Sequence, residues 1–295
     1  TLPLGIPKLI VSTVGGGDVA PYVGSRDISI MPSVVDVAGV NRISRLIYAN
    51  AAGAIAGMVE TELPPFERER PLIAASMFGN TTACVERARA RLESKGFEVL
   101  VFHATGTGGR TMQSLVEDDF IAGLFDITTT ELADEVCGGV FSAGPERVNI
   151  AATKKVPVVF APGCVDMCNF AALSTVPEKY HGRNLYEWNA NVTLLRTNVE
   201  ENIRIGRMLA ATANMCAGPA AVILPTNGVS MLDSPGNPFW DPTADRACFD
   251  TIKQNLRQDI SVVEVDANIN DPEFADKAAD LMLKMLINES QSQEN

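Results

Sequence analysis

Short runs of β-branched and other apolar residues alternate along the chain with stretches in which apolar positions recur at helical spacing. From residue 71 onward this alternation is regular. It predicts strands at 71–78, 97–102, 123–128, 156–161, 220–224 and 261–266. It predicts helices at 81–95, 111–120, 199–215, 243–256 and 271–286. Successive βα units build a parallel sheet with helices on its faces, so we expect a doubly wound, Rossmann-like α/β domain with a mostly parallel sheet.

The first 60 residues follow a different plan. A β-branched run at 6–13 ends in the glycines of 15–17 and Asp18, which predicts a strand that feeds a tight loop. From Ser33 to Met58 apolar positions recur at helical spacing among many small residues, which predicts a helix that its glycines could break. Small residues let another backbone approach closely. We therefore expect this helix to form a tight interface and the chain to be a dimer.

Composition separates the chain into parts. Residues 60–70 are charged, contain two prolines and show no apolar period, so they are predicted to link two domains. The expected division is a first α/β part at 1–59, a second domain at 71–288 and a polar tail at 289–295. Residues 163–196 show little periodicity and are expected to be irregular. Such a segment is either a lid or ligand-binding loop, or an excursion that forms an interface.

Charge and hydropathy exclude several classes of protein. The net charge of −12 disfavours binding to nucleic acid or to an anionic membrane surface. Every apolar run ends well before the roughly 18–20 residues that span a bilayer, and no signal pattern opens the chain, so we expect a soluble protein. The six cysteines lie mostly in apolar stretches, which favours reduced thiols and the cytoplasm. Cys164 and Cys168 lack a second pair, so no metal site is predicted.

The strongest candidate site is the segment His103-Ala-Thr-Gly-Thr-Gly-Gly-Arg110, which follows a predicted strand and precedes a predicted helix. Helix N-termini at the carboxyl ends of parallel strands offer free backbone N–H groups to anions. The segment lacks the Lys-Ser/Thr ending of a P-loop and the usual dinucleotide fingerprint. It is predicted to hold an anionic, phosphate-bearing small molecule, and the alternative is a turn that permits close packing. The predicted ligand-binding residues are Thr105, Gly106, Thr107, Gly108, Gly109 and Arg110.

Two further loops occupy similar positions. Gly79–Thr82 carries Thr81 and Thr82, which either cap the next helix or donate to the same ligand. Asp126–Asp134 brings hydroxyls and acids, which suit either catalysis or helix capping. His103 is placed for acid–base chemistry, although a histidine packed against the sheet is the plainer interpretation. The candidate catalytic residues are His103, Glu131 and Asp134.

Several of these runs resemble the UPF0261 family: residues 8–13, 101–110, 128–134, 139–147 and 238–242. The resemblance covers nearly the whole chain. It implies two α/β domains, the first known as a Tm-1-like ATP-binding domain, in a family that includes the virus-inhibiting region of tomato Tm-1. It also implies that residues 1 to about 58 are only the last strand, glycine loop and helix of that first domain. The family pattern has a histidine where this chain has Asn268, which removes one candidate acid or base.

Three functions follow as hypotheses. The first is a binding protein whose two domains enclose a nucleotide or another phosphorylated metabolite, with ATP as a cofactor in a longer protein. The second is a hydrolase or lyase that acts on a carbonyl or phosphate substrate through His103. The third, suggested by the resemblance alone, is an inhibitor that acts on a protein partner. For the first hypothesis the N-terminal part would contribute Ser12, Thr13, Gly15, Gly16, Gly17 and Asp18.

Overall fold

The computed structural model describes residues 2–63 and 69–293, and the side chains as far as residue 288. The chain divides into two compact units, Thr1–Glu69 and Arg70–Asn295. Part of the predicted linker, residues 64–68, lies outside the described residues. Each unit is considered by itself below.

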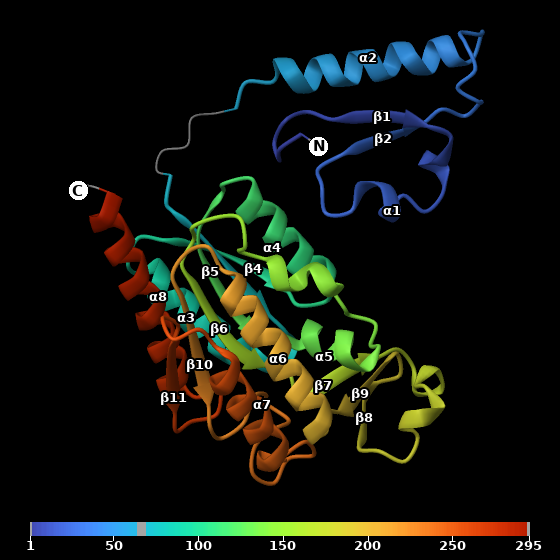
Figure 1. Cartoon of the computed structure of the whole chain (residues 1–295). Helices are drawn as coiled ribbons and strands as arrows, with labels where there is room; N and C mark the ends of the chain where they lie inside the picture. The colour runs from blue at the N-terminus through green and yellow to red at the C-terminus, as the bar shows by residue number, and fades with distance from the viewer. Residues whose placement is uncertain (1, 64–68, 294–295) are drawn as a thin grey trace. The chain divides into compact units, whose positions relative to one another are not determined.

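A six-stranded parallel sheet forms the centre of the second unit (Figure 1). Its strands are β3 (Leu72–Met77), β4 (Glu98–His103), β5 (Ile121–Thr128), β6 (Val158–Gly163), β10 (Ala220–Pro225) and β11 (Ser261–Val265). They lie in the order β11-β10-β6-β5-β3-β4. The predicted α/β class is confirmed. Because the chain places β4 on one side of β3 and then crosses to β5, the order reverses between β3 and β5, and ligands of open α/β sheets bind at such a point.

Helices cover this sheet. They are α3 (Thr82–Glu93), α4 (Thr107–Glu117), α5 (Thr130–Cys137), α6 (Val199–Met215), α7 (Pro242–Asn255) and α8 (Pro272–Gln293). Helices α3 and α8 pack side by side and close a hydrophobic core with the strands, while α6 packs against α7 (Figure 1). Fully buried side chains such as Phe125 and Phe274 fill that core. All six cysteines are free and buried within these elements and the adjoining loops.

The predicted and observed helix bounds differ most at the end of α8 and at the start of α4. Helix α8 continues to Gln293, past the predicted end at residue 286 and into the predicted tail. Helix α4 begins at Thr107 and not at residue 111, because Gly106 takes a φ of +80° that starts the helix early. Helix α6 matches its prediction, and Asn198 and Glu201 form a capping box at its start.

The segment predicted to be irregular contains a second sheet instead. Strands β7 (Met167–Phe170), β8 (Leu185–Asn189) and β9 (Val192–Arg196) pair antiparallel in the order β7-β9-β8. The prediction was wrong because these strands have only four or five residues and β7 is buried on both faces, so no alternation of apolar and polar residues marks it.

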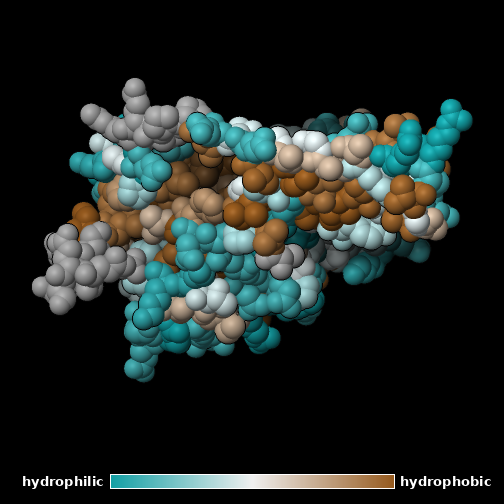
Figure 2. Space-filling model, turned by 90° about the horizontal axis from the view of Figure 1, so that it is seen from above, coloured by the Kyte–Doolittle hydropathy of each residue, from teal (hydrophilic) through white to brown (hydrophobic). Residues whose placement is uncertain are grey.

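The first unit is small. It contains β1 (Leu9–Ser12) parallel to β2 (Ser29–Pro32), the short helix α1 (Ala20–Val23) and the long helix α2 (Ser44–Glu60). The prediction of a helix from Ser33 was wrong at its start, because Val34 and Gly39 take positive φ angles of 63° and 75°. Several large apolar side chains of this unit are exposed, and Figure 2 shows apolar residues gathered in a band.

Candidate functional site

The glycine segment at 103–110 closes on a side chain of the protein itself. The Glu131 Oε1 atom accepts hydrogen bonds from the backbone N–H groups of Gly106, at 2.7 Å, and Gly109, at 3.1 Å. Glu131 is buried in α5, a helix whose start the sequence indicated only as possible capping. Backbone N–H groups at a helix start bind anions, and here the Glu131 carboxylate is the anion they bind.

A single guanidinium holds this carboxylate from its other side. The Arg147 Nε atom lies 2.8 Å from Glu131 Oε2, and its Nη2 atom lies 2.7 and 2.8 Å from the two oxygens of Asp126. All three side chains are buried. Two carboxylates therefore share one cation, and the N–H groups of the glycine segment supply the remaining stabilisation of Glu131.

The glycines fit tightly around this arrangement. A Cβ atom on Gly109 would lie 2.4 Å from Glu131 Oε2, and one on Gly108 would lie 1.8 Å from the His103 carbonyl oxygen. At Gly106 it would lie 2.6 Å from the Ser142 carbonyl oxygen. Close packing and the Glu131 carboxylate thus explain why a side chain has no room at Gly106, Gly108 and Gly109. Of the other predicted residues here, Thr107 and Arg110 are exposed in the first turn of α4, and Thr105 is half-buried.

The predicted threonines of the Gly79–Thr82 loop have different surroundings. Thr81 is buried, and its Oγ1 atom lies 2.8 Å from Oγ1 of Thr128 on β5. This contact joins the loop after β3 to the end of β5, the two strands between which the sheet order reverses. Thr82 is exposed and begins α3.

The predicted residues of the first unit serve its own local turns. The Ser12 hydroxyl accepts from the Val14 N–H at 3.3 Å, and Thr13–Gly16 form a short 3-10 helix. A Cβ atom on Gly15 would lie 3.0 Å from the backbone of Pro32, and Gly16 and Gly17 have more room. Asp18 accepts from the Ala20 N–H at 3.0 Å.

The three candidate catalytic residues have separate environments. His103 is exposed at the end of β4. Asp134 is buried, and its Oδ1 atom accepts from the N–H groups of Phe141 and Asn169, both at 3.1 Å. Its Oδ2 atom accepts from the Asn169 amide at 2.7 Å. The Glu131 and Asp134 carboxylates therefore both accept hydrogen bonds from the protein. His103 lines a small cavity, described below, that neither carboxylate lines.

Asp134 makes stability depend on pH. Burial raises the pKa of Asp134 to about 7, whereas an unfolded aspartate titrates near 3.9. Between these values the folded chain keeps a proton that the unfolded chain releases, so the free energy of unfolding falls as pH rises, by up to about 1.4 kcal/mol per pH unit. We expect urea unfolding from pH 4.5 to 7.5 to show a shallower decline in Asp134→Asn than in wild type. Asp259→Asn, at an exposed carboxyl, should keep the wild-type dependence of the unfolding free energy on pH. If wild type and both variants show the same dependence, the raised pKa of Asp134 is refuted.

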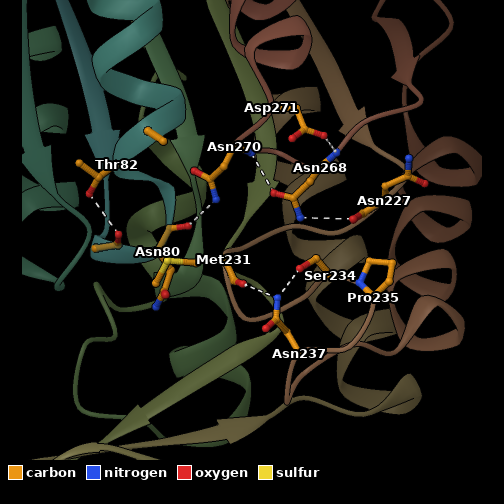
Figure 3. A pocket seen from close by; sticks show the side chains of 12 residues that line it. Asn80, Thr82, Asn227, Met231, Ser234, Pro235, Asn237, Asn268, Asn270 and Asp271 are labelled. Atoms are coloured by element: carbon orange, nitrogen blue, oxygen red, sulfur yellow. Dashed lines mark hydrogen bonds between the residues drawn. The ribbon is translucent and has the colours of Figure 1, made fainter.

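A cavity of about 950 Å³ lies at the carboxyl ends of β3, β10 and β11 (Figure 3). We call it the asparagine cavity. Its walls come from the loops after these strands, from the first residues of α3, and from Asn270 and Asp271 just before α8. It is lined by Gly79, Asn80, Thr82, Ala83, Asn227, Met231, Ser234, Pro235, Asn237, Asn268, Asn270 and Asp271.

Two asparagines hold its walls together. The Asn268 amide donates to the carbonyl oxygens of Asn227, Ser230 and Asp233 at 3.0 to 3.2 Å. The Asn270 amide donates to the Asn80 carbonyl oxygen at 2.9 Å, which joins the loops after β3 and β11. Of the predicted site residues, Thr82 of the Gly79–Thr82 loop lines this cavity, whereas its asparagines were not predicted. The signal that could have found it is the repeated placement of asparagine directly after predicted strands, where loops meet at one edge of the sheet.

A buried charged cluster lies behind the loop after β10. The Ser230 hydroxyl donates to Asp166 Oδ2 at 2.8 Å. Arg196 pairs with Asp245 at 2.7 Å and lies 3.6 Å from Asp233. Burial and the neighbouring Asp233 carboxylate raise the pKa of Asp166 to about 7. Asp233 and Asp245 share the Arg196 guanidinium, and Asp166 binds the Ser230 hydroxyl, so these contacts fix the 228–241 loop against the antiparallel sheet.

None of the helices described is both long enough and apolar enough to cross a membrane. In the part of the chain that the structure describes, no three histidine, cysteine, aspartate or glutamate side chains are grouped so that they could hold a metal ion.

Comparisons with known proteins agree with this architecture. Residues 70–286 match the C-terminal domain, and residues 1–64 the N-terminal domain, of the "Uncharacterised protein family (UPF0261)". A UPF0261 protein of Clostridium tetani is 47% identical over 286 residues, which are 97% of this chain and 71% of that protein. A second, from Rhizobium meliloti, is 48% identical over 94% of this chain and 70% of its own length. The ToMV resistance protein Tm-1(GCR237) of Solanum lycopersicum is 41% identical over 97% of this chain and 39% of its own length.

Proposed function

This chain belongs to the UPF0261 family, and from that premise we propose that its second unit is a ligand-binding domain that holds a nucleotide or another phosphorylated metabolite in the asparagine cavity. The observation that carries the proposal is the convergence of two helix starts on one cavity. Helix α3, of 12 residues, begins at Thr82, and α8, of 22 residues, begins at Pro272, beside Asp271.

Helix starts favour anions for two reasons. The first N–H groups of a helix have no partner within it, and the helix dipole places partial positive charge there. Thr82 and Ala83, which line the cavity, are the first two residues of α3. Among the described residues no lysine or arginine lines the cavity, the Asp271 carboxylate accepts from the Asn268 N–H, and the Thr82 hydroxyl donates to the Gly79 carbonyl oxygen. Recognition of an anionic group would therefore rest on the backbone N–H groups at the start of α3.

Size and chemistry agree with a small metabolite. A volume of about 950 Å³ lies within the range of about 300–1,000 Å³ typical of small-molecule sites. The amide and hydroxyl groups of Asn227, Asn237 and Ser234 face a ligand that offers both donors and acceptors, as sugar hydroxyls do. The glycine segment at 103–110 is the weaker candidate, since a phosphate there would have to displace the Glu131 carboxylate from Gly106 and Gly109.

A charge placed in the cavity tests this proposal. Ala83 is exposed in the first turn of α3, where glutamate suits the helix dipole. We expect ribose 5-phosphate or a nucleoside monophosphate to raise the melting temperature of wild type. At 100 times its dissociation constant such a ligand adds about 2.7 kcal/mol. Ala83→Glu should fold normally and weaken binding at least tenfold, because its carboxylate repels the phosphate.

The matched control is Ala90→Glu, an exposed site on the same helix away from the cavity, which should bind as wild type does. Arg110→Ala should also bind normally if the ligand is not held by the glycine segment. The proposal fails if none of the compounds shifts the melting temperature, or if Ala83→Glu keeps wild-type affinity.

A further inference from the structure

A second cavity, of about 240 Å³, lies on another side of the Phe78–Asn80 segment. We call it the aromatic cavity. It lies among the ends of β3 and β4, the loop after α5 and the strands β8 and β9. Its lining is mostly apolar, with the polar side chains of Asn80, His103 and Asn189. Gly79 and Asn80 line both this cavity and the asparagine cavity, so the two are neighbours across one short loop.

Aromatic rings supply much of its wall. Phe78 and Phe141 pack edge to face, with ring centroids 6.1 Å apart. Trp188, at the end of β8, also lines the cavity and remains 43% exposed. An exposed indole beside an apolar cavity offers a flat surface on which another aromatic ring can stack, as nucleobases do on aromatic side chains.

Asn80 adds a specific polar requirement. The residue is 2% exposed, and its amide nitrogen donates to the Met167 sulfur at 3.4 Å. Its Oδ1 atom receives no hydrogen bond from the described residues. Figure 3 shows the Asn80 side chain pointing away from Asn270, which binds its carbonyl oxygen. A buried acceptor without a donor is unfavourable, and an N–H group of a ligand in the aromatic cavity would satisfy it.

We infer that the aromatic cavity binds a planar nitrogen heterocycle, of the nucleobase type, that presents an N–H group to Asn80 and stacks beside Trp188. The inference rests on the proposed function and deepens it. The ring lies in the aromatic cavity, and the polar or phosphorylated part of the same molecule lies in the asparagine cavity. His103 then contacts the ring edge and takes part in recognition.

Tryptophan fluorescence tests this directly. The chain has two tryptophans, so Trp240→Phe leaves Trp188 as the only indole. We expect saturable quenching of this variant by at least one of adenosine, guanosine, cytidine and uridine. Ribose 5-phosphate, which has no aromatic ring to stack, should bind in a thermal-shift assay without quenching the Trp188 fluorescence. Asn80→Leu, made in the same background, should weaken nucleoside binding at least tenfold.

A second pair of variants tests the inference whether or not Asn80→Leu folds, with nucleoside binding measured by calorimetry. Trp188→Ala removes an exposed ring and should weaken nucleoside binding at least tenfold. Phe120→Ala, which removes another exposed ring, 42% exposed and outside both cavities, should leave it unchanged. The inference is overturned if no nucleoside quenches Trp188, or if Trp188→Ala binds nucleosides as wild type does. Binding of ribose 5-phosphate in that case keeps the proposed function and removes only the ring assignment.

Discussion

Arg147→Met is expected to lower the free energy of unfolding of the second unit by about 3–5 kcal/mol, the usual cost of removing one partner from a buried ion pair. The substitution leaves Asp126 and Glu131 buried without their shared cation. Glu131 then keeps only the N–H groups of Gly106 and Gly109. The start of α4 should loosen with it, because that carboxylate joins α5 to the glycine segment.

Urea unfolding monitored by circular dichroism measures this effect. Arg87→Met is the matched control, since Arg87 pairs with Asp276 at 2.7 Å on the surface, where ion pairs contribute about 0–1 kcal/mol. Adding Glu131→Gln to Arg147→Met should recover part of the loss, because it removes one of the two unpaired charges. If Arg147→Met lowers the free energy of unfolding no more than Arg87→Met does, the buried cluster of Arg147, Asp126 and Glu131 does not stabilise the second unit.

Gly228→Ala is expected to lower the free energy of unfolding by about 2–6 kcal/mol and to disrupt the asparagine cavity. Gly228 has a φ of +116°, and a Cβ atom there would lie 1.7 Å from the Asp233 carbonyl oxygen and 2.8 Å from the Asn268 amide nitrogen. Backbone strain and overpacking each cost about 1–3 kcal/mol. Relief of the contact would move Asp233 or Asn268 and so separate the loops that Asn268 joins.

Gly236→Ala gives the comparison within the same loop. Gly236 also has a positive φ, of 87°, but a Cβ atom there would have nothing within 4 Å. It should therefore cost only the conformational strain, about 1–2 kcal/mol. Thermal and urea unfolding of both variants measure the difference. Equal losses would mean that the close approach of the backbone at Gly228 is unimportant.

Periodicity predicted most of the second unit because each of its long helices and buried strands carries its own repeating signal. Helix α6, with an apolar stripe and its capping Asn198, lay where the sequence placed it. Short elements carry too few residues for such a signal, and the antiparallel strands β7, β8 and β9 were therefore missed. In the first unit the spacing from Ser33 looked helical, yet the positive φ of Val34 interrupts it, and nothing in the apolar pattern reports a backbone angle.

The site was harder to predict because its contacts are distant in sequence. The glycine segment was recognised as an anion-binding start of a helix, but nothing in the segment reveals that Glu131, 25 residues after Gly106, supplies the anion. The asparagine cavity depends on the hydrogen bond from Asn270 to Asn80, which are 190 residues apart. Only the pairing order of the strands brings those two loops together.

The labelling rates of the six buried cysteines can measure how often the surrounding parts of the structure open. Burial raises the pKa of Cys84 and of Cys216 to about 12, so a thiol reagent reaches a reactive thiolate only when the surrounding element opens. Each labelling rate therefore reports one region: Cys84 the start of α3, Cys137 the end of α5, and Cys248 the middle of α7. The Cys84 N–H lies 3.4 Å from the Asn270 side-chain oxygen, so the chemical reactivity of this one sulfur is tied to the wall of the asparagine cavity.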